Sequence, residues 1–312
     1  MLFITDFIRF ASRCLYLLIL ACPLSAFADQ DRSITVYITV DWEGWSLDEE
    51  NLETMDRFRE QHPHIPMVHL LNPAYFTQSG ADSTRITAQI RRTLRPNDVI
   101  GLHLHGWRSL VEYCGLSYQN TPTFAEGNEG CNVQDCGYTV SLELAYDQPA
   151  LAQLLDCSAK LLDQHGFGRP RHFRAGGWQL GPNLAAALHA QDFIWDSSSI
   201  DAKLIAGAWG EQSALVQQLK SLHPHATTLD QPVTMLPGLM HFPNNAGLAD
   251  YTSTDQIVSL FQALLDAHQS VMVTGFHQET AFVFLDRLAE AIPRLETAAQ
   301  AAGVKLHWGK TD

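Results

Sequence analysis

The sequence predicts a single α/β barrel, because short apolar, strand-like runs alternate with longer amphipathic stretches along the chain. Repeated strand–helix units favour a parallel sheet, and their number fits one closed barrel with helices on its outside. An open, doubly wound sheet is the structural alternative. The first predicted strand is not followed by a G-x-G-x-x-G pattern, which argues against a dinucleotide-binding form of that alternative.

The first half of the chain contains the clearest strand–helix units. Its first strand-like run alternates and is rich in β-branched side chains, which favour strands. The helix after it carries three acidic residues in its first turn, where they interact favourably with the helix dipole. The predicted elements are, in order, a strand at 34–40, a helix at 47–62, a strand at 67–71, a helix at 84–94 and a strand at 99–105.

The second half continues the alternation with one break. Residues 201–231 show no clear period, and the last helix is expected to bend or break at Pro293, which cannot donate a backbone hydrogen bond. The predicted elements are a helix at 149–165, an extended segment at 171–175, a helix at 184–191, a strand at 193–196, an extended segment at 234–242, a helix at 255–268, a strand at 271–276, a helix at 284–302 and a strand at 304–308.

The amino terminus has the pattern of a removable signal peptide. Two arginines precede an apolar run at 15–20, and small residues follow up to Ala28, which gives an A-x-A cleavage site. The apolar run is shorter than the roughly 20 residues that span a bilayer. We therefore expect a signal peptide at 1–28, one periplasmic or secreted domain at 29–312, and no stable membrane insertion after cleavage. The alternatives are an uncleaved membrane anchor and a lipid-modified Cys22.

The expected domain contains an insertion at about 108–147 that is rich in Gly, Asn and Thr. Export makes disulfide bonds possible, and the expected domain has four cysteines, which allow three complete pairings. At least one bridge is expected to brace the loop that holds Cys114, Cys131 and Cys136. Cys157 lies instead on the apolar face of a predicted helix, as a buried thiol would.

The chain is strongly acidic, with a formal net charge of −14. Such a chain repels nucleic acid and anionic membrane surfaces, and no basic run in the sequence overrides this charge. A neutral or cationic glycan fits the charge better than a polyanion does. The oligomeric state is not indicated by the sequence.

Charged and metal-binding side chains recur at the carboxyl ends of the predicted strands, where functional side chains gather in a parallel α/β barrel. Residues two apart on a strand face the same side, so a histidine pair or a carboxylate pair with that spacing acts together. Two imidazoles and one carboxylate are a catalytic zinc set that leaves a position open for water. The candidates are Asp41 and Glu43 on the first strand, His103 and His105 on the third, and His277 on the late apolar strand.

Each candidate also has a structural alternative. Of Asp41 and Glu43, the carboxylate that does not bind the metal is suited to take a proton from water as a general base. His277 is suited to protonate a leaving nitrogen. Arg174 and Asp196 are suited to orient these two groups through hydrogen-bonded charge pairs. The structural alternatives are buried, hydrogen-bonded histidines, capping or salt-bridging carboxylates, an Arg174 that bridges loops and an Asp196 that caps a turn.

These segments, in this order, resemble the motifs of the polysaccharide deacetylase family, carbohydrate esterase family four. The resemblance extends from the first predicted strand to His277. Any one of the motifs is weak alone, and five in order are fairly specific. They are VDWEG at 40–44, GLHLH at 101–105, FRAGGW at 173–178, WDSS at 195–198 and GFH at 275–277.

The resemblance implies a distorted (β/α)7-type barrel and a bound Zn²⁺ or similar divalent ion. It also implies a hydrolase that removes acetyl groups from N-acetylhexosamines in a polysaccharide or oligosaccharide. The residues that it implies are Asp41 as the base, steadied by Arg174; His277 as the acid, paired with Asp196; and Glu43, His103 and His105 as the metal ligands.

The sequence departs from the family pattern at two motifs. The usual adjacent aspartates are replaced by two carboxylates separated by Trp42, and the second of them is Glu43. The usual H-x-x-x-H spacing is replaced by H-x-H, and Trp107 stands at the expected second histidine position. The alternative in which Asp41 is the metal ligand and Glu43 the base therefore stays open.

Four further residues are predicted to contact the substrate. His69 and Asn72 end the second predicted strand, and Trp107 and Trp178 are suited to stack on sugar rings. Two other functions remain as alternatives. One is a catalytically silent glycan-binding protein on the same barrel. The other is a different metal-dependent amidohydrolase, although such enzymes use H-x-H in the first strand rather than after two strand–helix units.

Overall fold

The computed structural model describes residues 32–125 and 135–310. The predicted signal peptide at 1–28, which includes Cys22, and the insertion residue Cys131 lie outside the described residues. Among the helices of the described chain, none combines the length and the apolarity that crossing a bilayer requires.

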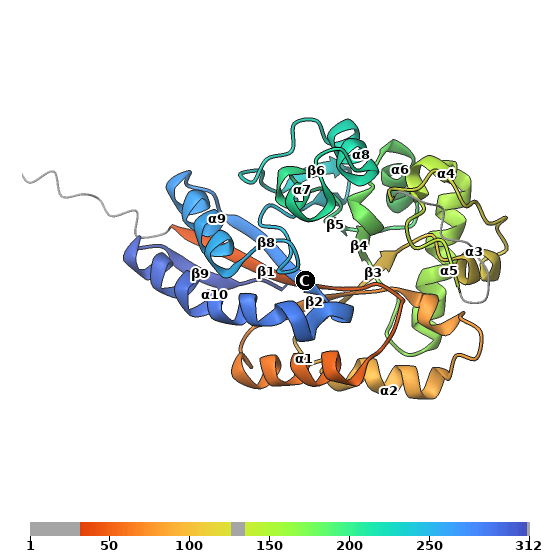
Figure 1. The fold of residues 1–312 in the computed structure, drawn as a ribbon, viewed down its shortest axis with the longest axis horizontal. Coiled ribbons are helices and arrows are strands. Elements are labelled where there is room, and N and C mark those ends of the chain that lie inside the picture. The colour runs from red at the N-terminus through yellow and green to blue at the C-terminus, as the bar shows by residue number, and fades with distance from the viewer. Residues whose placement is uncertain (1–31, 126–134, 311–312) are drawn as a thin grey trace, which may run out of the picture.

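Within the described residues, a curled nine-stranded sheet forms the core of the fold (Figure 1). Its strands follow the order β6-β7-β5-β4-β3-β2-β1-β8, and β9 also pairs with β1. All of these pairs are parallel except β6 with β7, which fits strands joined by helical crossovers. The strands are β1 (Ser33–Trp42), β2 (Met67–Leu71), β3 (Val99–Leu104), β4 (His172–Ala175), β5 (Trp195–Asp196), β6 (Val233–Leu236), β7 (Leu239–His241), β8 (Val271–His277) and β9 (Lys305–Trp308).

An irregular segment after β7 brings the sheet back to β8. The Ala246 N–H donates to Val273 O at 3.1 Å, and the Ala249 N–H donates to Gly275 O at 2.8 Å. The side chain of Asn245 accepts a third bond, from the Val273 N–H. Because isolated contacts replace a full strand here, the barrel is closed but distorted. The predicted distorted (β/α) barrel in a single domain is therefore confirmed.

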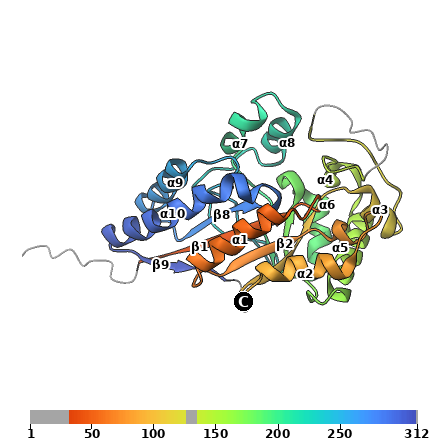
Figure 2. The same ribbon diagram turned by 60° about the horizontal axis from the view of Figure 1, so that its bottom comes forward.

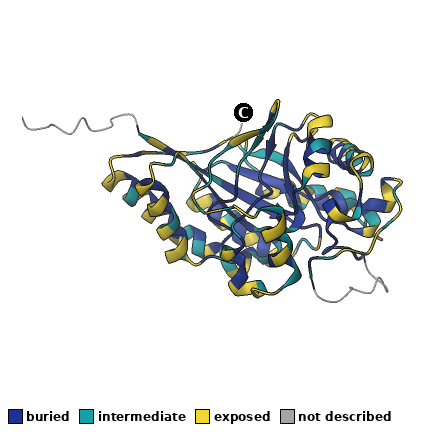
Figure 3. Ribbon diagram, turned by 90° about the horizontal axis from the view of Figure 1, so that it is seen from above, coloured by how far each residue is buried: buried dark blue, intermediate teal, exposed yellow. Residues whose placement is uncertain are grey.

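Helices cover the outside of the sheet and bury the side that faces it (Figure 3). Polar side chains fix where some of them begin: Asp147 accepts from the Ala150 N–H, and Ser253 forms a capping box with Gln256. The longer helices are α1 (Glu49–Gln61), α2 (Ser83–Thr93), α5 (Gln148–Gln164), α6 (Pro182–Ala190), α8 (Ala214–Leu222), α9 (Thr254–Asp266) and α10 (Ala281–Ala301). The short ones are η1 (Pro73–Phe76), α3 (Arg108–Tyr113), α4 (Leu142–Ala145), η2 (Gly176–Trp178), α7 (Lys203–Trp209) and η3 (Gln278–Thr280).

Three segments differ from the sequence prediction. The expected extended segment at 234–242 is a hairpin of β6 and β7, because Gly238 adopts a φ of +79° in the turn between them. Helix α10 begins earlier than expected, at Ala281, and continues through Pro293 without a break. Residues 201–231, which show no clear period, contain α7 and α8.

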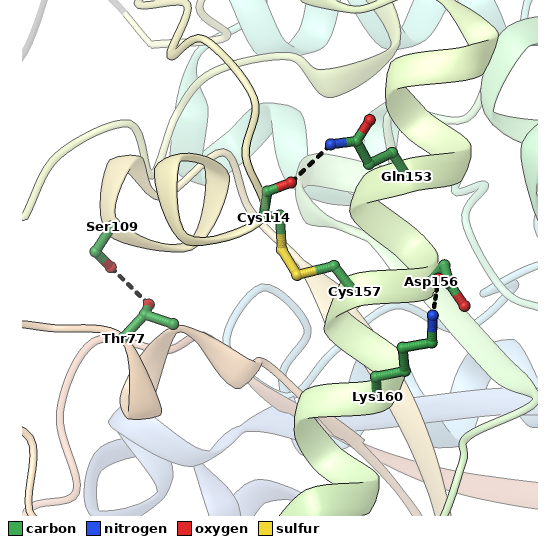
Figure 4. Close-up of a disulfide and its surroundings, with 7 residues drawn as sticks. All are labelled: Thr77, Ser109, Cys114, Gln153, Asp156, Cys157 and Lys160. Atoms are coloured by element: carbon green, nitrogen blue, oxygen red, sulfur yellow. Dashed lines mark hydrogen bonds and ion pairs between the residues drawn. A yellow bond between two sulfur atoms is a disulfide. The ribbon is translucent and has the colours of Figure 1, made fainter.

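A disulfide fastens the insertion to the barrel. It joins Cys114, which follows α3, to Cys157 in α5 (Figure 4). A hydrogen bond of 2.7 Å between the Thr77 and Ser109 hydroxyls ties α3 to η1 nearby. The suggestion that Cys157 is a buried thiol is therefore wrong, since its sulfur is bonded to that of Cys114 in the insertion. Cys136 is also disulfide-bonded.

Replacing both Cys114 and Cys157 with Ser is expected to lower the free energy of unfolding by about 2–4 kcal/mol. The bridge joins positions 43 residues apart, so its loss increases the conformational freedom of the unfolded chain. Urea denaturation of the oxidised protein measures the difference, with zinc content as the check that the active-site pocket is intact. An unchanged denaturation midpoint and slope in the double variant would contradict the prediction.

Candidate active site

The five chemically active residues predicted at strand ends converge on one point. Asp41 lies in β1 directly opposite His277 at the end of β8, and Glu43 follows β1. The Glu43 carboxylate lies 3.4 Å from His103 Nε2, 2.6 Å from His105 Nε2 and 3.1 Å from His277 Nε2. The carboxyl ends of β1, β3 and β8 therefore supply one compact, buried cluster.

The two histidines of the H-x-H pair are held in one tautomer. His103 Nδ1 lies 2.9 Å from the carbonyl oxygen of Arg174, and His105 Nδ1 lies 2.6 Å from that of Tyr138. A carbonyl oxygen only accepts, so Nδ1 carries the proton on each ring. When neutral, each ring turns an unprotonated Nε2 toward Glu43, and the two Nε2 atoms are 3.1 Å apart.

This donor set fits a divalent cation. Within the described residues, Glu43 Oε2 has no hydrogen-bond partner even though His105 Nε2 is close to it. In the neutral tautomer neither of these two atoms carries a proton. Two bare imidazole nitrogens and a carboxylate oxygen that meet in a buried place are unsatisfied unless a positive charge lies between them. Glu43, His103 and His105 have the ligand types of a catalytic zinc site, and their ligand atoms lie within 4.8 Å of one another.

The electrostatics of the cluster also favour a cation. Burial raises the pKa of Glu43, but electrostatic attraction to the imidazoles of His105, His277 and His103 outweighs burial and holds the pKa well below its usual value. Burial lowers the pKa of His103, yet the Glu43 carboxylate reverses this and the pKa is raised. Glu43 is thus an ionised carboxylate that draws positive charge to the nitrogens.

Asp41 is held by a fully buried arginine rather than by the histidine pair. Arg174 Nη1 donates to Asp41 Oδ1 and to the Thr39 hydroxyl, each at 2.8 Å. The other guanidinium donors bond to the carbonyl and the hydroxyl of Ser197. With every arm of Arg174 occupied, the Asp41 carboxylate is fixed at the wall of the pocket beside Glu43.

The partner of His277 is Asp250, which the sequence analysis missed. His277 Nδ1 lies 3.0 Å from Asp250 Oδ1, and the His277 backbone N–H donates to Asp250 Oδ2 at 3.2 Å. The Thr280 hydroxyl also donates to this carboxylate. Burial lowers the pKa of His277, but the Asp250 charge outweighs burial and the pKa is raised well above its usual value.

The predicted pairing of Asp196 with His277 is wrong. Asp196 Oδ2 lies 2.6 Å from His241 Nδ1, and His241 Nε2 lies 2.6 Å from the Ser199 hydroxyl. The reason is strand register: Asp196 pairs with Phe173, the neighbour of Arg174 in β4. Adjacent residues of a strand point to opposite faces, so Asp196 and Arg174 lie on different sides of the sheet.

A small pocket with a cavity volume of about 20 Å³ lies against these residues. The insertion supplies Phe124 and Tyr138 to its wall, and the Tyr138 ring stacks on His105 with ring centroids 4.2 Å apart. A Cβ atom at Gly176 would come within 2.6 Å of the His105 ring, so only glycine allows this close approach. The lining residues are Asp41, His103, His105, Phe124, Tyr138, Ala175, Gly177, Trp178, Trp209, Leu215, Tyr251 and His277.

Of the four residues predicted to contact the substrate, Trp178 alone lines this pocket. His69 is fully buried between Trp42 and Asp98 and has no surface for a ligand. Asn72 and Trp107 are also buried, and both side chains donate to the carbonyl oxygen of Glu43. The prediction is therefore corrected for these three residues, because their polar atoms are used inside the protein.

Glu279 completes the support of Glu43 and was not singled out by the sequence analysis. Its carboxylate accepts the backbone N–H groups of Glu43 at 3.1 Å and of Trp45 at 3.3 Å, and also the Tyr75 hydroxyl. Burial, followed by the nearby charge of Glu43, raises the pKa of Glu279 to about 7. The loop that carries Glu43 is thus fixed by hydrogen bonds to both its backbone N–H and its backbone carbonyl groups.

Replacing Glu279 with Gln is expected to weaken zinc binding about 10- to 100-fold, the usual cost of losing a group that orients a metal ligand. The amide would direct a donor at N–H groups that now donate to the carboxylate. Competition with a chelator measures the zinc dissociation constant. Glu296→Gln, an exposed change on α10, is the matched control, and equal zinc affinity in both variants would refute the role.

Comparisons with known proteins give structural similarity only. Neither a protein-family model nor a curated protein matches the sequence. The chain is similar to a family 4 carbohydrate esterase from Streptomyces lividans in complex with acetate, at 13% identity and a TM-score of 0.43 over 88% of this chain and 91% of that one. It is also similar to the chitin deacetylase from the fungal pathogen Colletotrichum lindemuthianum, at 10% identity and a TM-score of 0.43 over 88% and 87%.

A third similar structure is a family 4 acetyl xylan esterase from Clostridium thermocellum in complex with a cobalt ion. Its identity is 10% and its TM-score 0.38, over 87% of this chain and 86% of that one. At these low identities and TM-scores, the fold and function of this chain rest on its own residues.

Proposed function

We propose that the protein is a metal-dependent carbohydrate N-deacetylase, a hydrolase that removes acetyl groups from N-acetylhexosamines in a polysaccharide or oligosaccharide. The observation that carries the proposal is the meeting of three kinds of group at one pocket. They are a ligand set for a divalent ion, a carboxylate fixed by an arginine, and a histidine fixed by a carboxylate.

Glu43, His103 and His105 would hold the ion, Zn²⁺ or another divalent metal. A bound ion of this kind polarises the amide carbonyl and lowers the pKa of water. Glu43 is assigned as the ligand rather than Asp41, because Glu43 alone contacts both histidines of the pair. Asp41 is then left as the base, with its Oδ1 held by Arg174.

The remaining residues divide the proton transfers of amide hydrolysis between them. Asp41 takes a proton from the attacking water, and His277 gives a proton to the amide nitrogen as the carbon–nitrogen bond breaks. The products are acetate and the free amine of the sugar. Asp250 keeps His277 oriented and protonated, as its contact with Nδ1 and the raised pKa indicate. Asp196 is assigned no part in these steps.

The proposal places this reaction outside the cytoplasm. The signal-like pattern at 1–28 supports export, and the Cys114–Cys157 disulfide suits an oxidising compartment. A periplasmic or secreted enzyme would meet acetylated glycans there. Mass spectrometry of the amino terminus of protein recovered from the cell envelope and medium tests cleavage after Ala28.

The deciding experiment is acetate release from N-acetylated glycans by residues 29–312 loaded with zinc. Release that depends on zinc and is lost in Asp41→Asn supports the proposal. No acetate from a panel of acetylated oligosaccharides and polysaccharides, with zinc at one equivalent, would reject it. Tight binding of the same glycans without release would favour the alternative of a catalytically silent glycan-binding protein.

A further inference from the structure

The contact between Asp196 and His241 continues into a third side chain, on the face of the sheet opposite Arg174. Asp196 in β5 is the register partner of His241 in β7, so the two side chains lie side by side on that face. His241 Nδ1 lies 2.6 Å from Asp196 Oδ2, and His241 Nε2 lies 2.6 Å from the hydroxyl of Ser199. Asp196, His241 and Ser199, the serine cluster, therefore form one continuous line of hydrogen bonds.

The direction of these hydrogen bonds follows from the chemistry of the groups. The Asp196 carboxylate only accepts, so His241 Nδ1 carries the proton and Nε2 accepts from the Ser199 hydroxyl. The carboxylate also accepts from the backbone N–H and the hydroxyl of Ser198. Of these donors only His241 can become positively charged. A proton passed from Ser199 to His241 would therefore be stabilised by the negative charge of Asp196.

The serine cluster has the arrangement of nucleophile, base and orienting carboxylate of a serine hydrolase, which is recognised by geometry and not by order in the chain. Ser199 follows β5 and precedes α7, and a turn from strand to helix is where many such enzymes present the nucleophile. Among the described residues, neither Ser199 nor Ile200 uses its backbone N–H in a hydrogen bond. The N–H that follows a nucleophile can stabilise an oxyanion, so this donor is available here.

The nucleophile and the base of the serine cluster have limited access to solvent. Ser199 is 6% exposed and the His241 side chain is 13% exposed, whereas Asp196 is fully buried. Ser199 lies where the chain leaves the sheet for α7 and α8, which project from the rest of the molecule (Figure 2). This limited access favours a small acyl group, the size of an acetyl, on a substrate that approaches from solvent.

We propose that the serine cluster is a second catalytic site, which hydrolyses esters of small carboxylic acids without a metal. Ser199 Oγ bonds to the ester carbonyl carbon while its proton passes to His241 Nε2. The carbon–oxygen bond to the alcohol then breaks, and the alcohol leaves with that proton. Water attacks the acyl-serine and gives a proton to His241, which returns it to Ser199 Oγ as the acid is released. This activity is separate from the proposed function, since it uses no residue of the metal site.

Covalent labelling with methanesulfonyl fluoride, a small probe that sulfonylates activated serines, tests the nucleophile directly. Peptide mass spectrometry is expected to find the methylsulfonyl group on Ser199, both in zinc-loaded protein and after treatment with a chelator. His241→Gln is expected to slow the labelling about 10²- to 10⁴-fold, as the loss of a general base does. Ser79→Ala is the matched control, because Ser79 is exposed and lies outside the serine cluster. It should be labelled at Ser199 as fast as the wild type.

Ester turnover is the second readout. Chelator-treated wild-type protein is expected to hydrolyse 4-nitrophenyl acetate, and Ser199→Ala to reduce the rate to that of the solution alone. Circular dichroism establishes that each variant is folded, and Asp196→Asn replaces His241→Gln if that variant is not. No label on Ser199 of the folded wild type, labelling that is not slowed in the variant, or ester hydrolysis unchanged by Ser199→Ala would overturn the second site. Zinc-dependent acetate release from glycans decides the proposed function separately in each of these cases.

Discussion

Replacing Asp41 with Asn is expected to lower kcat for acetate release by about 10²- to 10⁴-fold, the usual contribution of a positioned general base. The amide oxygen can still accept from Arg174, so the buried guanidinium keeps a partner and the fold is preserved. Because Glu43, His103 and His105 are untouched, zinc content is expected to remain at one equivalent. Acetate release and metal analysis of the same preparation measure both quantities.

The same variant distinguishes the two roles that the sequence leaves open for the carboxylates. Asp48→Asn, an exposed change in the loop after Glu43, is the matched control and should retain full activity. Loss of zinc together with activity in Asp41→Asn would mean that Asp41 is the ligand. A kcat within a few-fold of wild type would mean that Asp41 is not the base.

The residues that bear the chemistry could be predicted because each lies at the carboxyl end of a recognisable apolar strand. In a parallel barrel the carboxyl ends of the strands lie at the same end of the barrel, so residues found there in the sequence are expected to lie close together. Asp41, His103 and His277 satisfy this condition, and the structure brings them to one pocket. The choice between Asp41 and Glu43 could not be made in this way. It depends on Arg174 reaching across the barrel to one carboxylate and not to the other.

The positions of the Asp250 and Asp196 side chains could not be predicted in the same way, for two different reasons. Asp250 lies in the irregular segment that closes the barrel between β7 and β8, where no period of two marks a face. Asp196 lies in a two-residue strand, too short to reveal by alternation which face it shares with its neighbours. Its side is set by register with Phe173, which only the assembled sheet defines.

Supporting contacts were also hidden from the sequence. Asn72 was predicted to contact the substrate because it follows a strand end, and Trp107 because its ring can stack on a sugar. Both side chains donate instead to the Glu43 carbonyl. Glu279 contacts the same loop from η3, where its carboxylate accepts the backbone N–H of Glu43. A buried polar group must find a partner, but the sequence does not say whether that partner is a ligand or another part of the chain.

Replacing His277 with Ala is expected to lower kcat by about 10²- to 10⁴-fold without loss of zinc, since the leaving nitrogen would have to depart without a proton donor. Asp250→Asn is the more informative change, because it keeps His277 but removes the negative charge that favours the protonated form of that histidine. Asp250 raises the pKa of His277. The histidine acts as an acid only when protonated, so activity falls as pH rises through that pKa.

Removing the Asp250 charge should therefore lower the pKa of His277 and move the basic limb of the pH profile of kcat/KM to lower pH. Asp196→Asn is the matched control, because Asp196 contacts His241 and not His277. A pH profile displaced in Asp196→Asn but not in Asp250→Asn would restore the pairing expected from the sequence motif. A profile displaced in Asp250→Asn alone would mean that this chain draws the carboxylate for its acid from the barrel closure instead of from β5.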